Sequence, residues 1–136
     1  MTVKELLQNK CCTLYTIDQQ STIVKAMEHL IHNQISCLPI IKDKHLIGII
    51  SDKDIFRAIF ENQSYFDELT VGDFMESNVI IGVAEDNIEY IANLMTKNRI
   101  RHIPIVEKNT LIGLVSIGDI VKAKEKNIQF ENRYLK

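Results

Sequence analysis

An internal repeat constrains this chain more than any other feature of its sequence. An offset of 65 residues carries residues 23–58 onto residues 88–123 without a gap. The identical pairs include Pro39/Pro104, Gly48/Gly113, Ser51/Ser116 and Asp54/Asp119. A self-match at a fixed period indicates two copies of one supersecondary unit. Because each copy alone is too short for a stable core, we expect the two copies to pack on each other within the 136 residues.

The hydrophobic pattern predicts the same elements in each copy, in the order strand, helix, strand, strand, helix. Short apolar runs predict strands at residues 14–17, 37–41, 46–50, 103–106 and 111–115. Ser21 or Thr22 is expected to cap the first helix, and Asn33 and Asn98 are expected as left-handed caps at helix ends. The predicted fold class is α/β, with two repeated β-α-β-β-α units. We assign residues 1–60 to the first repeat, 61–70 to a linker loop, 71–124 to the second repeat and 125–136 to a C-terminal helical tail.

Composition narrows the class of protein and its partners. A net charge of −2 gives no electrostatic reason to expect nucleic acid or an anionic membrane. No apolar run in the sequence approaches the length of a membrane span. The three cysteines do not suggest a disulfide framework, so a reducing cytoplasm is the simplest setting.

The repeated Ser-x-x-Asp segment is the strongest candidate for a binding site. In each copy it follows a β-branched run that contains a glycine, so that a strand is expected to lead directly into a helix N-terminus. Such an end attracts anions, and a carboxylate there can accept hydrogen bonds from the two hydroxyls of a ribose. Lys53 in the first copy adds positive charge, whereas Gly118 in the second leaves room. The glycine before each serine would let a flat ligand approach the backbone. The alternative is that each segment is a plain helix capping box.

Other chemistries have weaker support. The sequence contains no nucleophile elbow, no phosphate-binding loop of the Walker type and no dinucleotide fingerprint. His29, His32 and Cys37 are candidate metal ligands, but a metal site needs three or four converging ligands and nothing else is clearly supplied. A small metal-binding protein therefore stays as an alternative interpretation.

With these motifs in view, the chain resembles a tandem pair of CBS domains, a family named after cystathionine β-synthase. The resemblance rests on residues 36–40 and 46–54 and on their counterparts 100–106 and 113–119, and it extends from about residue 3 to residue 123. It implies a pseudo-twofold pair with clefts between the two repeats, each able to hold an adenosyl ligand. In such modules the early strand contacts the base, the residues around the proline line the cleft, and the Gly-hydrophobic-x-Ser/Thr-x-x-Asp signature binds ribose and phosphate.

Carried onto this sequence, the resemblance implies a set of ligand-binding residues in three groups. These are Thr16, Ile17, Ile81 and Gly82 for the base; Ser36, Cys37, Leu38, Pro39, Arg101, His102, Ile103 and Pro104 around the prolines; and Ser51, Lys53, Asp54, Ser116, Gly118 and Asp119 in the signatures. AMP, ADP or ATP is the expected ligand, with S-adenosylmethionine or NAD as alternatives.

The function implied is that of a regulatory sensor without catalytic activity. We expect a homodimer that acts on a regulated protein, with neither nucleic acid nor a membrane as partner. The alternative is a structural interaction module whose clefts stay empty. If each cleft is completed by its own repeat, the second should hold phosphate better, because Arg101 can make a bidentate contact where Ser36 cannot. The alternative is that Arg101 reaches across to the ligand of the other repeat.

Overall fold

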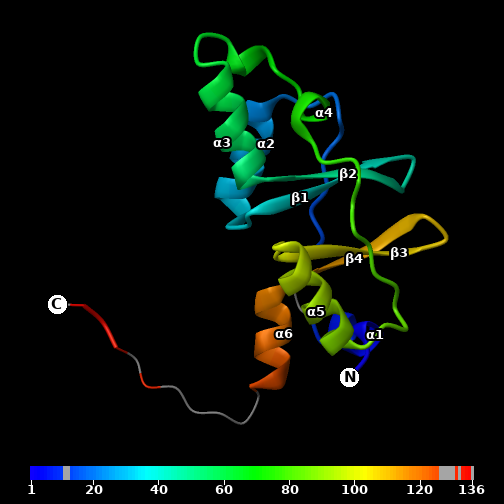
Figure 1. The fold of residues 1–136 in the computed structure, drawn as a ribbon. Coiled ribbons are helices and arrows are strands. Elements are labelled where there is room, and N and C mark those ends of the chain that lie inside the picture. Colours follow the sequence, from blue (N-terminus) through cyan, green and yellow to red (C-terminus); the bar gives the residue numbers. More distant parts are fainter. Residues whose placement is uncertain (11–12, 126–130, 132, 136) are drawn as a thin grey trace.

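Two copies of one α/β unit make up the fold (Figure 1). The computed structural model describes residues 1–10, 13–125, 131 and 133–135. The elements are α1 (Val3–Gln8), α2 (Ile23–Asn33), β1 (Cys37–Lys42), β2 (His45–Ser51), α3 (Asp52–Glu61), the 3-10 helix η1 (Phe66–Glu68), α4 (Val71–Phe74), α5 (Ile88–Asn98), β3 (His102–Glu107), β4 (Thr110–Ser116) and α6 (Ile117–Lys124).

Each copy contributes one β-hairpin to a four-stranded sheet of order β1-β2-β4-β3. Both hairpins turn through two residues with positive φ, Asp43 and Lys44 in one and Lys108 and Asn109 in the other. Such turns match the natural twist of antiparallel strands. The two hairpins are paired to each other at His45 and Thr110, in the turn region. The two hairpins lie beside each other with their turns at the same end (Figure 1), and the pseudo-twofold pair predicted from the sequence is confirmed.

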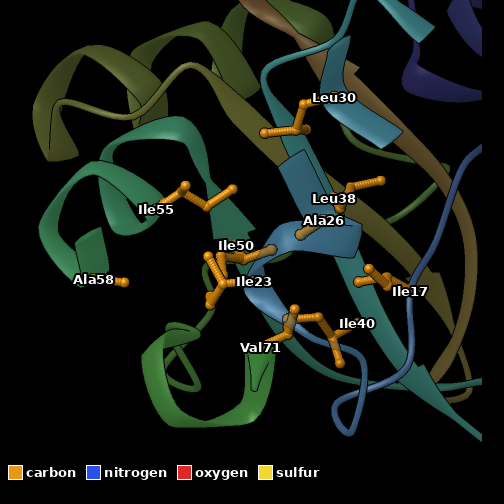
Figure 2. Close-up of a cluster of buried hydrophobic side chains, with 10 residues drawn as sticks. All are labelled: Ile17, Ile23, Ala26, Leu30, Leu38, Ile40, Ile50, Ile55, Ala58 and Val71. Carbon is orange, nitrogen blue, oxygen red and sulfur yellow. The ribbon is translucent and has the colours of Figure 1, made fainter. Parts of the chain in front are cut away.

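Two separate hydrophobic cores lie on the outer sides of the hairpins. Figure 2 shows the first, in which Ile23 of α2, Ile50 of β2 and Ile55 of α3 point toward one another. The second core contains Ile91 of α5 and Ile105 of β3, both fully buried. The four longer helices α2, α3, α5 and α6 therefore turn their apolar stripes toward the hairpin of their own repeat.

The short helix that leads into each repeat packs on the other repeat. Val3 of α1 is buried in the second core, and its N–H donates to the carbonyl of Asp86 at 2.8 Å. Val71 of α4 is buried in the first core, and its N–H donates to the carbonyl of Ser21 at 2.8 Å. Each core is completed by a helix that precedes the other repeat, so α1, which the sequence places in the first repeat, contributes to the second core.

Two local expectations need correction. The strand expected at residues 14–17 is reduced to one parallel bridge between Ile17 and Ile40. The helix caps fall one residue later than expected: Gln34 and Arg99 take the left-handed conformation, each with φ 54°. The asparagines before them stay helical, and Asn33 donates its side-chain N–H to the carbonyl of His29 at 3.0 Å. An asparagine that caps its own last turn in this way has no need to leave the helix.

The last helix is shorter than the sequence suggests. α6 ends at Lys124, and among the described tail residues 131 and 133–135 none is helical. The rest of the helix expected toward Lys136 lies outside the described residues.

Candidate functional site

A cavity of about 580 Å³ lies at the junction of the two repeats. It is lined by Leu7, Lys10, Thr13, Leu14, Tyr15, Gln34, Ile35, Ser36, Cys37, His102, Ile112, Gly113, Leu114, Ser116 and Asp119. Residues 13–15 and 34–37 come from the first repeat, the residues from His102 onward come from the second, and Leu7 and Lys10 come from α1 and the residues that follow it. The volume falls in the range typical of small-molecule sites, roughly 300–1,000 Å³.

Five residues of the predicted set meet in this cavity: Ser36, Cys37, His102, Ser116 and Asp119. The other predicted residues do not line it: Thr16, Ile17, Leu38, Pro39, Ser51, Lys53, Asp54, Ile81, Gly82, Arg101, Ile103, Pro104 and Gly118. Side chains alternate along a strand, and so Leu38 and Ile103 turn away from the cavity and are fully buried in the two cores.

The cavity is completed by both repeats. The pre-proline residues Ser36 and Cys37 of the first repeat face Ser116 and Asp119 of the second. The premise that each cleft is completed by its own repeat is therefore wrong for this cavity, and Arg101 does not line the cavity that contains Asp119.

Asp119 is held in place by a capping box at the start of α6. Its carboxylate accepts a hydrogen bond from the N–H of Ser116 at 2.8 Å, and its own N–H donates to the Ser116 hydroxyl at 3.1 Å. β4 ends at Ser116 and α6 begins at the next residue. Since the strand passes directly into the helix, the carboxylate and the first N–H groups of the helix are fixed at the cavity wall.

Sequence reasoning missed the partner of this carboxylate. The ammonium group of Lys10 lies 2.8 Å from Oδ2 of Asp119 and 2.7 Å from the carbonyl oxygen of Leu114. Burial alone would raise the pKa of Asp119, but hydrogen bonds from Lys10 and Ser116 outweigh it and hold the pKa below its ordinary 3.8. Nothing in the sequence near Lys10 signals this contact, because it depends on α1 reaching across to the second repeat.

Cys37 and His102 occupy equivalent positions of the two repeats, and both line the cavity. Burial, followed by the charges of Asp54 and Asp52, raises the pKa of the Cys37 thiol to about 12. Burial, followed by the charges of Arg101 and Lys10, lowers the pKa of His102 below 6.5. At neutral pH both groups are therefore uncharged, and Lys10 and Asp119 are the charged side chains among the residues that line the cavity.

The glycine of each signature has a packing role that differs from the one expected. A Cβ atom added at Gly113 would lie 2.8 Å from Cδ1 of Leu7, and one added at Gly48 would lie 2.6 Å from the sulfur of Met75. Leu7 lies in α1 and Met75 directly follows α4, at corresponding positions of the two segments that lead into the repeats. The space beside each glycine is thus filled by Leu7 or Met75, and Gly113 also lines the cavity.

The first-repeat signature lies at the pseudo-equivalent position. The carboxylate of Asp54 accepts hydrogen bonds from the N–H of Ser51 at 2.9 Å and from its hydroxyl at 3.1 Å. Lys53 is exposed in the first turn of α3. The capping box is therefore formed in both copies.

The described residues form neither a metal site nor a membrane-spanning helix. Among them, no three His, Cys, Asp or Glu side chains are grouped so as to hold a metal ion. No helix in the described part of the chain is both long and apolar enough to span a bilayer.

The comparisons with known proteins agree with this geometry. The family model of the CBS domain matches residues 3–61 and 71–126. A curated relative, the CBS domain-containing protein CBSX3, mitochondrial, of Arabidopsis thaliana, is 36% identical over 107 residues; the match covers 75% of this chain and 52% of the relative. The chain thus spans about half the length of that relative.

Two solved structures with bound ligands share the fold. The CBS domain pair of MJ0100, in complex with 5′-methylthioadenosine and S-adenosyl-L-methionine, has a TM-score of 0.82 and 26% identity, with 94% of this chain and 98% of that chain covered. CBSX2 in complex with AMP has a TM-score of 0.79 and 27% identity, with 92% and 96% covered.

Proposed function

Because the chain belongs to the CBS domain family, we propose that it is a regulatory module that binds an adenine nucleotide and has no catalytic activity of its own. The cavity between the repeats is the ligand site. Binding there would change how the two repeats pack, and so the surface that a regulated protein meets. The cytoplasm is the proposed compartment, since Cys37 is a free thiol and reducing compartments keep thiols unpaired.

The observation that carries the proposal is the position of Asp119 at the cavity wall. Its Oδ2 accepts hydrogen bonds from Ser116 and Lys10, and in the described part of the chain no donor is bonded to Oδ1. A ribose diol can donate to such a carboxylate, and charge-assisted hydrogen bonds of this kind are stronger than neutral ones. The opposite wall, residues 34–37 and 13–15, offers apolar and backbone surface for a base.

Adenosyl compounds are favoured as the ligand class because two proteins of the same fold bind them: CBSX2 binds AMP, and MJ0100 binds 5′-methylthioadenosine and S-adenosyl-L-methionine. Within that class we propose AMP first, since the cavity offers one cationic side chain, Lys10, to one phosphate. ADP, ATP, NAD and S-adenosylmethionine are the competing ligands.

A purely structural module with empty clefts is the alternative. Purified protein, denatured and analysed by mass spectrometry, should release an adenine nucleotide if the ligand stays bound through purification.

A catalytic role for Cys37 is disfavoured, because thiols act as nucleophiles in the thiolate form and burial raises the pKa of this thiol to about 12.

Replacement of Asp119 by asparagine tests the ribose contact. Asp119→Asn keeps the size of the side chain and removes its charge, so AMP affinity measured by calorimetry should fall about tenfold to a hundredfold, the value of one charge-assisted hydrogen bond. Asp54→Asn is the matched control, because it alters the other signature and leaves this cavity intact. If Asp119→Asn binds AMP as tightly as the parent protein, the signature of the second repeat is a plain helix cap; a double variant with Asp54→Asn that also binds AMP like the parent would make both signatures plain caps.

We also propose a homodimer that covers the outer face of α2 and α3. Ile31, Phe56 and Phe60 are 71%, 67% and 76% exposed on this face, and beside them lies an apolar groove of about 250 Å³. Exposed apolar patches of this kind mark interfaces, and a second copy of the chain supplies a self-complementary patch. Light scattering should give a dimer mass for the parent protein and a monomer mass for Phe56→Glu. A monomeric parent at micromolar concentration would contradict the proposal.

A further inference from the structure

The contacts of Lys10 differ from those of an ordinary surface ion pair. Its side chain and that of Asp119 are 23% and 21% exposed, and both line the cavity. The Lys10 backbone is fixed by a hydrogen bond from its N–H to the carbonyl of Leu7 at 3.2 Å. The ammonium group therefore reaches the cavity from a fixed base, through a long and flexible side chain.

The equivalent place in the first repeat is closed by backbone atoms. There the carbonyl of Ile49, the counterpart of Leu114, accepts a hydrogen bond from the N–H of Glu76 at 2.8 Å, and the N–H of Ile49 donates to the carbonyl of Glu76 at 2.9 Å. In the second repeat the Lys10 ammonium takes the place of that N–H. A backbone bridge cannot move without unpacking the chain, whereas a lysine side chain can swing between partners.

Lys10 and Asp119 balance each other, so the cavity has no net charge while His102 is neutral. A phosphate entering such a cavity needs a cation, and Lys10 is the one cationic side chain among the described residues that line it. A ribose hydroxyl that donates to the Asp119 carboxylate also weakens the hold of that carboxylate on Lys10. The phosphate on the same nucleotide then becomes the stronger partner for the ammonium group.

We propose that Lys10 is the residue that selects phosphorylated ligands for this cavity, by transferring its ammonium group from Asp119 to the ligand phosphate as the ribose engages the carboxylate. The inference rests on the proposed nucleotide-binding function. Adenosine offers the diol without the phosphate, and so competes with Lys10 for Asp119 and gains nothing in return. The carbonyl oxygen of Leu114, a half-buried residue, can then accept a hydrogen bond from water in place of the one from Lys10.

Calorimetric titration of AMP and adenosine into four proteins tests this assignment. They are the parent chain, Lys10→Met, Lys10→Arg and the control Lys4→Met, which removes an exposed lysine from α1. In Lys10→Met the AMP affinity should fall about tenfold, the value of one charge-assisted hydrogen bond, while adenosine binds as well as before or better. Lys10→Arg should restore the preference for AMP, and Lys4→Met should leave both affinities unchanged. Thermal melting without ligand shows whether each variant is folded. If Lys10→Met does not fold, Lys10→Gln is used in its place.

The outcomes separate this inference from the function on which it rests. If the parent chain binds AMP and adenosine and Lys10→Met weakens both by the same factor, Lys10 is a structural tether and the inference is overturned while the proposed function stands. Equal binding of AMP and adenosine by the parent chain overturns the inference in the same way. If the parent chain binds neither ligand, the proposed function and the inference both fail.

Discussion

The two Ser-x-x-Asp signatures share their backbone and differ in what surrounds them. In both, a strand passes into a helix through a capping box with hydrogen bonds of the same kind. Asp119, however, pairs with Lys10 at 2.8 Å, while in the described part of the chain no ion pair includes Asp54. The two copies therefore share the backbone scaffold and differ in the side chains around the two signatures.

The two repeats also differ where α1 and α4, with the residues that follow them, pass the signature glycines. Beside Gly48 the chain continues into a backbone bridge between Ile49 and Glu76, whereas beside Gly113 it makes the side-chain contact of Lys10. The signature of the first repeat is thus bordered by a backbone bridge, and that of the second repeat by the movable side chain of Lys10. Each prediction below compares an equivalent pair of residues in the two repeats.

The largest difference is expected when alanine replaces the two signature glycines. A Cβ at Gly48 would lie 3.1 Å from the backbone oxygen of Glu76 as well as 2.6 Å from the sulfur of Met75, so the bridge itself must shift. A Cβ at Gly113 meets side-chain atoms of Leu7, which can rotate. We expect Gly48→Ala to lower the free energy of unfolding by about 1–3 kcal/mol and Gly113→Ala by less.

Urea denaturation of the two alanine variants and the parent chain measures this difference, with each variant as the control for the other. The slope of the transition should stay constant, so that the midpoint reports stability. A larger loss in Gly113→Ala would show that the Leu7 contact is the more rigid one.

Much of the fold could be predicted from the sequence because local patterns determine it. The strands of both hairpins were placed within one or two residues, and both capping boxes were identified from four-residue motifs. The exchange of α1 and α4 could not be predicted, since Val3 and Val71 begin similar apolar turns and either would fill either core. Local sequence gives no preference between the two arrangements.

The candidate site was predictable to the same extent. Ser116, Asp119 and the residues before Pro39 follow from motifs whose positions in the chain fix their positions in the fold. The ion pair of Lys10 and Asp119 joins residues 109 positions apart, and it depends on the exchange of α1. The side chains that complete the cavity were missed for this reason, and Arg101 does not line the cavity that contains Asp119.

An intermediate effect is expected when asparagine replaces each signature aspartate in the absence of ligand. Asp54→Asn keeps the shape of its capping box, so its stability should change by a few tenths of a kcal/mol. Asp119→Asn also leaves the half-buried Lys10 without its counter-charge, and should cost about 1 kcal/mol. Both variants keep their fold.

A double-mutant cycle with Lys10→Met and Asp119→Asn isolates that contact. Denaturation of the parent chain, the two single variants and the double variant should give a coupling free energy near the cost of the ion pair, about 1 kcal/mol at low salt and less at high salt. A coupling free energy of zero would mean that Lys10 and Asp119 do not stabilise each other in solution.

The smallest effect concerns Cys37 and His102, which should limit stability from opposite ends of the pH scale. Burial and the charges of Arg101 and Lys10 lower the pKa of His102 in the folded protein below 6.5. As the pH falls from 6.5 through that lower value, the unfolded chain binds the proton first, so the folded state loses stability. Burial raises the pKa of Cys37 from 9.0 to about 12, so its contribution is present below pH 9 and is lost as the pH rises toward 12. Unfolding free energies measured from pH 7.5 to pH 5 should therefore fall less steeply in His102→Gln than in the parent chain, while Cys37→Ala keeps the parent slope over this range because its thiol stays protonated in both states. If His102→Gln follows the parent curve, the imidazole is solvated in the folded protein and the cavity wall beside Lys10 is more open to water than its burial in this structure indicates.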